Sequence, residues 1–132
     1  MKKYPIAVLM VILLFLSFNP IRGYFIWKNT MRTIEGSSIK NITYWGEAGQ
    51  RRVLLNNDIK IFISELSRSG FYEYHRKPVG PTPNEGVIIT FDDGRKILVN
   101  RWSEDVFEVN GFAGSQILIK NVQLGRIYEN KM

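Results

Sequence analysis

The sequence predicts an α+β fold in which an N-terminal membrane helix precedes a small antiparallel sheet of about four or five strands. One amphipathic helix is expected to pack on one face of this sheet, and a short helix closes the chain. Three observations support this fold: an uncharged apolar run near the N-terminus, one segment with helical apolar periodicity, and several short strand-like segments separated by turn residues. The length of 132 residues accommodates the membrane helix and one small domain.

The apolar run extends from Pro5 to Leu16 and follows two lysines, as in the front of an export signal. A helix from Tyr4 to about Ile21 has roughly 18 residues, which is enough for a membrane anchor. The run lacks the polar stripe of a helix that is buried against a soluble core. We therefore expect residues 1–28 to be a retained signal anchor, with cleavage and secretion as the alternative.

Tyr24, Phe25 and Trp27 follow the run and are predicted to lie at the membrane interface, where amphipathic aromatic rings are favoured. Basic residues lie on both sides of the span, so charge alone does not fix its orientation. The short N-terminal tail and the absence of cysteine favour a single-pass protein of the cell membrane with an extracytoplasmic domain. The absence of cysteine also excludes disulfides, thiolate sites and the acyl anchor of a lipoprotein.

The net charge of +6 is concentrated at the N-terminus. Four basic residues lie within the first 28, which leaves 14 basic and 12 acidic residues and a net charge of +2 for the rest. A nucleic-acid binder is expected to keep its basic excess within the folded domain, on one face. We therefore predict no nucleic-acid partner. The expected partners are the bilayer and an envelope protein or peptide.

Polar and small residues from 29 to 38 predict a connector, and residues 39–132 are expected to form a single domain. The β-branched and aromatic residues from Ile39 to Trp45 predict a strand, and residues 50–55 are expected to pair with it as a short strand. The clearest helix is predicted from Asp58 to Ser69, because apolar residues recur there at spacings of three and four and two asparagines precede it as caps.

Residues 71–86 are rich in proline, glycine, aromatic and basic residues, which is typical of a binding loop. The candidate binding residues are Tyr72, Tyr74, His75, Arg76 and Lys77. In the alternative interpretation, the aromatic residues fill the edge of the sheet and the prolines stiffen a crossover. His75 is the only histidine, so it is interpreted as a surface side chain rather than a metal ligand or a base.

After Gly86 the pattern predicts a meander, with strands over 87–91, 96–102, 106–109 and 112–120. Turn residues separate these strands, including Asn110-Gly111, a strong hairpin signal. Asn121 is predicted to cap a short closing helix. The acidic pairs at 92–93 and 104–105 are interpreted as turn tips, because the fixed ligand spacing of a calcium loop is absent.

The segments Phe91-Asp92-Asp93-Gly94, Val109-Asn110-Gly111 and Asn121-Val122-Gln123-Leu124-Gly125, together with the short anchor, resemble small exported or membrane-anchored proteins of Gram-positive bacteria. The roles of that group are largely uncharacterised, so the resemblance implies location and architecture. In topology alone the predicted domain also resembles one repeat of the TATA-binding-protein fold. The residues that such proteins use on DNA have no counterpart here, so this resemblance implies no function.

The preferred function is a non-catalytic interaction or accessory module of the cell envelope. No catalytic residue, metal site or cofactor is predicted, because the motifs for nucleophiles, metals and phosphates are absent from the sequence. One alternative is an immunity or inhibitor protein that acts against a secreted toxin. Another is a small-ligand binder or enzyme with a pocket between helix and sheet, lined by Tyr72, His75, Arg101, Trp102 and Glu108.

Overall fold

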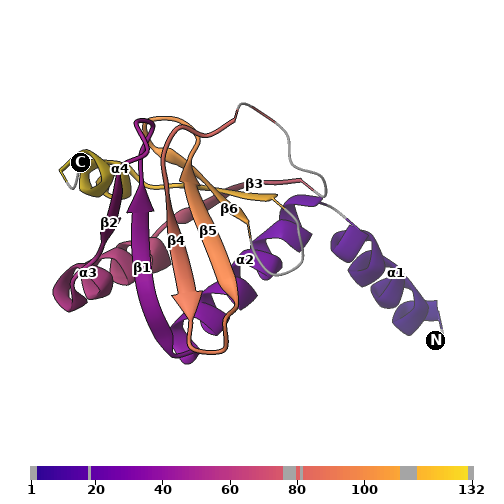
Figure 1. Cartoon of the computed structure of the whole chain (residues 1–132). Coiled ribbons are helices and arrows are strands. Elements are labelled where there is room, and N and C mark those ends of the chain that lie inside the picture. Colours follow the sequence, from indigo (N-terminus) through magenta and orange to yellow (C-terminus); the bar gives the residue numbers. More distant parts are fainter. Residues whose placement is uncertain (1–2, 18, 76–79, 81, 111–115, 131–132) are drawn as a thin grey trace.

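The structure is a computed structural model that describes residues 3–17, 19–75, 80, 82–110 and 116–130 (Figure 1). Its helices are α1 (Lys3–Ser17), α2 (Asn19–Gly36), α3 (Asn56–Ser67) and α4 (Val122–Asn130). Its strands are β1 (Ile39–Trp45), β2 (Arg51–Val53), β3 (Gly70–His75), β4 (Gly86–Phe91), β5 (Lys96–Arg101), β6 (Val106–Asn110) and β7 (Gln116–Lys120).

The described strands form one antiparallel sheet of seven strands in the order β2-β1-β4-β5-β6-β7-β3. Strands β4 to β7 follow one another as the predicted meander, and β1 extends the sheet beyond β4. The predicted short strand over residues 50–55 is present as β2 and pairs with β1. The predicted number of about four or five strands was too low, because the sheet has seven strands and β3 was not predicted as one of them. Helix α3 lies between β2 and β3 in the chain and therefore connects the two opposite edges of the sheet.

Strand β3 occupies residues that were predicted to begin the binding loop. It pairs with β7 along its length, with one register shift between Phe71 and Glu73. The loop prediction was therefore wrong for residues 71–75, where the high strand propensity of aromatic residues is realised by pairing with a distant strand. Phe71 packs against the core, as the alternative interpretation expected of an aromatic residue at the sheet edge.

Helices α2, α3 and α4 pack against one face of the sheet and share one apolar core with it (Figure 1). Burial of this apolar surface is the main favourable contribution to folding. The buried helical side chains are Trp27, Met31 and Ile34 of α2, Phe62 and Leu66 of α3, and Leu124 and Tyr128 of α4. They meet strand residues that include Ile42, Ile89, Ile97, Phe107 and Ile117.

Helix α2 belongs to the folded domain, which corrects two predictions. The predicted connector over residues 29–38 is wrong, because α2 continues to Gly36 and buries Met31 and Ile34. The predicted interface position of Trp27 is also wrong, because its side chain is 1 % exposed and lies in the core. Apolar residues at i, i+4 and i+7 form the buried face of the helix. The domain therefore begins within α2, before its predicted start at residue 39.

Gly23 allows α2 to lie directly on β3. A Cβ atom at this position would stand 2.3 Å from the Cβ atom of Tyr74 and 2.6 Å from the Cζ atom of Phe71. Any larger residue would push the helix and strand apart, because separations below about 3 Å are not tolerated between carbon atoms. The partly buried Tyr74 is thus a packing residue between strand and helix.

The helices predicted in the domain are confirmed, with one change at the caps. The apolar pattern that predicted a helix from Asp58 belongs to α3, but its N-cap is Leu55 and no side chain caps it, so the predicted asparagine cap is wrong. At α4 the predicted cap is confirmed, since Asn121 Oδ1 accepts a hydrogen bond of 3.1 Å from the Leu124 amide.

Helix α1 extends away from the sheet (Figure 1). Residues 5–14 are all exposed, and the large apolar side chains from Ile6 to Leu14 are 48 to 62 % exposed. The predicted membrane span from Tyr4 to Ile21 is not confirmed. Among the helices that the structure describes, none combines the length and the hydropathy needed to cross a bilayer.

The first prediction tests the position of α2. Trp27→Ala is expected to lower the free energy of unfolding by about 3–5 kcal/mol, because it leaves a large cavity in the core. The matched control is Phe25→Ala on the same helix, whose side chain is 59 % exposed, and it should change stability by less than about 0.5 kcal/mol. Urea unfolding of the full chain in detergent measures the free energy of unfolding of both variants and of the wild type. Equal effects of the two substitutions would contradict the observed burial.

Candidate functional site

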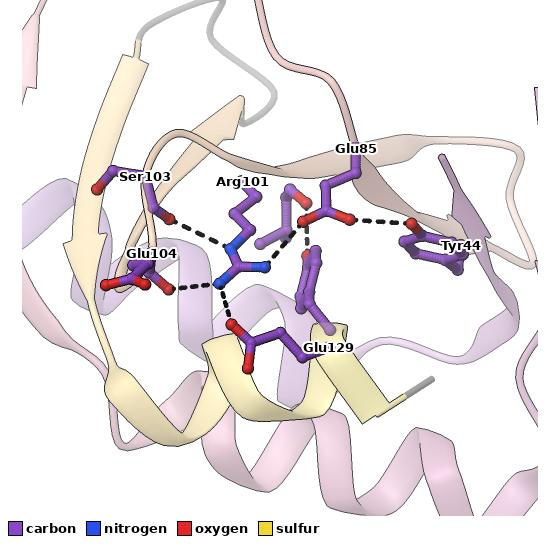
Figure 2. Close-up of polar contacts among 8 residues, drawn as sticks. Tyr44, Glu85, Arg101, Ser103, Glu104 and Glu129 are labelled. Atoms are coloured by element: carbon purple, nitrogen blue, oxygen red, sulfur yellow. Dashed lines mark hydrogen bonds and ion pairs between the residues drawn. The ribbon is translucent and has the colours of Figure 1, made fainter. Parts of the chain in front are cut away.

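A cluster of charged and polar groups surrounds Arg101, the last residue of β5 (Figure 2). Its Nη1 atom donates to Glu85 Oε1 at 3.0 Å, and its Nη2 atom donates to Glu129 Oε1 at 2.9 Å. Two further hydrogen bonds reach backbone carbonyls, from Nη2 to Glu104 at 3.0 Å and from Nε to Ser103 at 3.3 Å. We call this group the Arg101 cluster. It joins β5 to α4 and to the segment before β4.

Tyr44 of β1 completes the cluster, because its hydroxyl donates to Glu85 Oε2 at 3.0 Å (Figure 2). Burial, together with the hydrogen bond to Glu85, raises the pKa of Tyr44 to about 12. Burial tends to lower the pKa of Arg101, but its hydrogen bonds to Glu129 and Glu85 outweigh burial and raise the pKa. At neutral pH the tyrosine is therefore protonated and the guanidinium is charged, so neither group can accept a proton in general base catalysis.

The buried Tyr128 of α4 lies behind this cluster. Its hydroxyl donates to the Val99 carbonyl at 2.7 Å, and its ring contacts those of Tyr44, Phe62 and Phe107. Burial raises the pKa of Tyr128 well above its ordinary value. Because Arg101 and Tyr128 both engage α4, the polar contacts described here attach the C-terminal helix to the sheet.

A hollow of about 380 Å³ lies beside the Arg101 cluster. It is open to solvent on the side of the loops and does not lie between the helices and the sheet. Four hydrogen bonds to protein acceptors hold the Arg101 guanidinium in place at the edge of the hollow. Its lining residues are Glu47, Thr82, Pro83, Asn84, Glu85, Arg101, Trp102 and Ser103.

A separate buried polar group surrounds Glu108 of β6, which is 6 % exposed. The amides of Asn100 and Asn110 donate to Glu108 Oε1 at 3.2 and 3.1 Å, and the Gln116 amide donates to Oε2. Three amide donors satisfy most of the acceptor capacity of the Glu108 carboxylate, while the buried Asn100 Oδ1 has no hydrogen-bond partner among the described residues. In the described part of the chain, no three Asp, Glu or His side chains lie close enough together to hold a metal ion.

The structure does not bring the predicted binding residues into one site. Tyr72 is 50 % exposed and lies under the Lys120 ammonium, which is 5.9 Å from its ring centroid. Tyr74 packs on α2, and His75 Nε2 pairs with Glu73 Oε2 at 2.9 Å. Arg76 and Lys77 lie outside the described residues. The proposed convergence of Tyr72 and His75 with Arg101, Trp102 and Glu108 is also absent. Tyr72 and His75 lie on β3, Arg101 and Trp102 line the hollow beside the Arg101 cluster, and Glu108 belongs to the buried amide network.

A second hollow lies on the sheet face that the helices leave open, and the sequence analysis did not predict it. It has a volume of about 450 Å³ and spans β2, β1, β4 and β5. Within the described residues, the cations that line it, Lys40, Arg51 and Lys96, form no ion pair, and no acidic side chain lines it. Its remaining lining residues are Asn41, Thr43, Ile88, Thr90 and Gly94. We call this surface the basic sheet face. Strand alternation places it opposite the core, which is the only sequence signal for it.

The second prediction concerns the Arg101 cluster. Arg101→Gln is expected to lower the free energy of unfolding by about 3 kcal/mol, because it leaves the largely buried Glu85 carboxylate without its cation. Arg95→Gln is the matched control. It removes an arginine from the turn between β4 and β5, at the other end of β5, where the ion pair with Asp93 is half exposed. Chemical unfolding should show little change for that variant. A loss in Arg101→Gln no larger than that in the control would argue against the cluster as an attachment of α4.

Comparisons with known proteins inform the fold. No protein-family model matches the chain, and no curated protein matches it. Among solved structures, the fold is similar to that of a protein from Clostridium perfringens described as a "putative lipoprotein". The two share 15 % sequence identity with a TM-score of 0.59, and the match covers 79 % of this chain and 90 % of the other. At this identity the likeness shows the fold, and the α+β architecture of the chain is thus one that a second protein also adopts.

Proposed function

We propose that this chain is a non-catalytic domain of the cell envelope that α1 holds at the membrane, where the domain binds an envelope protein or peptide. The observation on which this rests is the exposure of α1. Its large apolar side chains are about half exposed or more along the helix, while the neighbouring domain has a filled core of its own. A continuous apolar surface of this kind marks a protein or membrane interaction site.

The bilayer is the partner that best fits α1. A helix of 15 residues is about 22 Å long, which is most of the hydrocarbon thickness of about 30 Å. Between Pro5 and Leu16 no side chain is charged or polar, so hydrocarbon can cover every face of the helix at once. A protein groove would leave part of this surface exposed to water. In this proposal α1 remains in the mature protein, and a secreted form that has lost it is the alternative.

The similar fold from Clostridium perfringens supports an extracytoplasmic location. That organism is a Gram-positive bacterium, and the description of its protein is that of a lipoprotein. A lipoprotein is held by acyl chains on a cysteine, and this chain has no cysteine. We propose that α1 supplies the tether that the acyl chains would supply, and that the domain lies outside the cytoplasm.

The basic sheet face is the surface that we propose for the protein or peptide partner. Lys40, Arg51 and Lys96 present three cations around hydroxyl and amide groups, which suits a partner with an acidic surface. Tyr72 lies on β3 at the other edge of the sheet and is available there as a separate exposed aromatic contact. An immunity or inhibitor role is a special case of this proposal, in which the bound partner is a toxin, and identification of the partner distinguishes it.

The third prediction tests the tether. Leu9→Lys combined with Ile12→Lys should move the full-length chain from washed membranes to the soluble fraction, because each lysine at the centre of a membrane helix costs about 2.5–3.5 kcal/mol. The matched control is Val53→Lys with Leu55→Lys, which places the same charges on exposed apolar residues outside α1. That variant should stay with the membranes. Recovery of the wild-type chain as freely soluble protein with α1 intact would overturn the proposed tether.

The fourth prediction tests the partner surface. A photoreactive amino acid at Thr90 should crosslink a partner in intact membranes, and Arg51→Glu with Lys96→Glu should lower the yield about tenfold through repulsion of an acidic surface. Lys60→Glu with Arg126→Glu reverses two exposed charges on α3 and α4 and should leave the yield unchanged. The same adduct at the same yield from all variants would remove this face from the proposal.

A further inference from the structure

Helix α2 has an exposed flank beside its buried face. Its buried positions are Gly23, Trp27, Met31 and Ile34, and the exposed positions lie on the rest of the helix surface. The flank next to the buried face presents Tyr24, Phe25, Lys28 and Arg32, a set that we call the α2 stripe. In Figure 1, α2 runs behind β4 and β5, on the sheet face that lies opposite the basic sheet face.

The α2 stripe combines exposed aromatic rings with cations. Tyr24 and Phe25 are 45 and 59 % exposed, and their rings meet edge to face with centroids 5.7 Å apart. The Lys28 ammonium lies 5.5 Å from the centroid of the Tyr24 ring. Because a ring and an ammonium lie together on one exposed surface, the stripe has both the apolar and the cationic component of an interfacial helix.

The charges of the stripe are not neutralised by protein groups. Across the described residues, neither Lys28 nor Arg32 takes part in an ion pair. The two cations line a shallow hollow of about 380 Å³ with Phe25, Ile26 and Asn29, and no carboxylate lines it. Glu35 is the single acid of α2 and lies near its C-terminal end, away from α1. The stripe is therefore complementary to an anionic surface.

The position of the stripe next to α1 in the chain indicates which anionic surface it binds. Helix α2 begins two positions after α1 ends, so Tyr24 and Phe25 follow the apolar helix by less than two further turns. If α1 is inserted in a bilayer, the stripe lies within reach of the lipid headgroups. We propose that the α2 stripe docks on anionic phospholipid headgroups, so that α2 lies along the membrane surface and the basic sheet face does not contact the bilayer. This inference rests on the proposed tether.

The experiment uses the absence of cysteine, which permits single labelling sites in the full-length chain. A fluorophore at Asn29→Cys reports the stripe, and one at Lys96→Cys reports the opposite sheet face. Each labelled chain is reconstituted into vesicles of phosphatidylcholine with or without phosphatidylglycerol, containing a lipid with a quencher on its headgroup. The label at residue 29 should be quenched in the anionic vesicles at low salt and less at high salt, and the label at residue 96 should not.

Substitutions make the readout specific to charge. Lys28→Gln with Arg32→Gln should lower the ratio of docked to undocked domain about 30-fold, since two headgroup-facing charges are removed. Lys60→Gln with Arg126→Gln removes two exposed charges from α3 and α4 and should leave quenching unchanged. Quenching at residue 29 that is independent of phosphatidylglycerol and of Lys28 and Arg32 would overturn the inference.

Two further outcomes are distinguishable in the same sample. A chain that does not float with the vesicles at all shows failure of the tether, and hence of the proposed function. A chain that floats with an unquenched label at residue 29 retains the tether and overturns only the docked orientation. Self-quenching between labels at residue 29 in sparsely loaded vesicles would assign the stripe to a second copy of the chain and would also overturn the lipid assignment.

Discussion

The insertion of one face of α2 into the core is the constraint on which the rest of this structure depends. Trp27, Met31 and Ile34 bury against the sheet, and Gly23 permits the direct contact with β3. Because α2 is part of the domain and begins two positions after α1 ends, the apolar helix and the folded body are close neighbours in the chain. A tether through α1 therefore keeps the domain near the membrane.

The C-terminal helix is attached by a different kind of interaction. The Arg101 cluster places one guanidinium between the carboxylates of Glu85 and Glu129, and Tyr128 adds a buried hydrogen bond and ring contacts (Figure 2). Desolvation of such charges offsets much of their attraction, so their main effect is to specify geometry. An arginine held by four protein acceptors beside a solvent-open hollow is thus better explained as a fixed structural joint than as a binding group.

Patterns within short stretches of sequence predicted those helices and turns that depend mainly on residues close together in the chain. The apolar spacing at Ile59, Phe62 and Leu66 predicted α3, and the turn at Gly94, which has a φ of +89°, separates the first two strands of the predicted meander. Helix α2 was missed although Trp27, Met31 and Ile34 have helical spacing, because the polar residues between them have the composition of a connector. The boundary was therefore placed by composition where periodicity would have been the better guide.

Non-local contacts explain what no local pattern could reveal. Strand β3 exists because β7, more than 40 residues later in the chain, offers it a pairing edge. The Arg101 cluster joins Tyr44 to a carboxylate 41 residues away and β5 to a carboxylate 28 residues away. The basic sheet face likewise needs β1, β4 and β5 side by side. Sequence alone can indicate that these residues are polar, but only the strand order brings their charges together.

The two cationic surfaces differ in what surrounds them, and this difference separates their roles. The α2 stripe adds exposed aromatic rings to its charges and lies next to an apolar helix, so its surroundings favour a lipid interface. The basic sheet face surrounds its charges with threonine and asparagine side chains, which form hydrogen bonds but do not enter hydrocarbon. Since α2 packs on the sheet face opposite the basic sheet face, a domain that docks through the α2 stripe leaves the polar surface off the bilayer, where a protein partner can reach it.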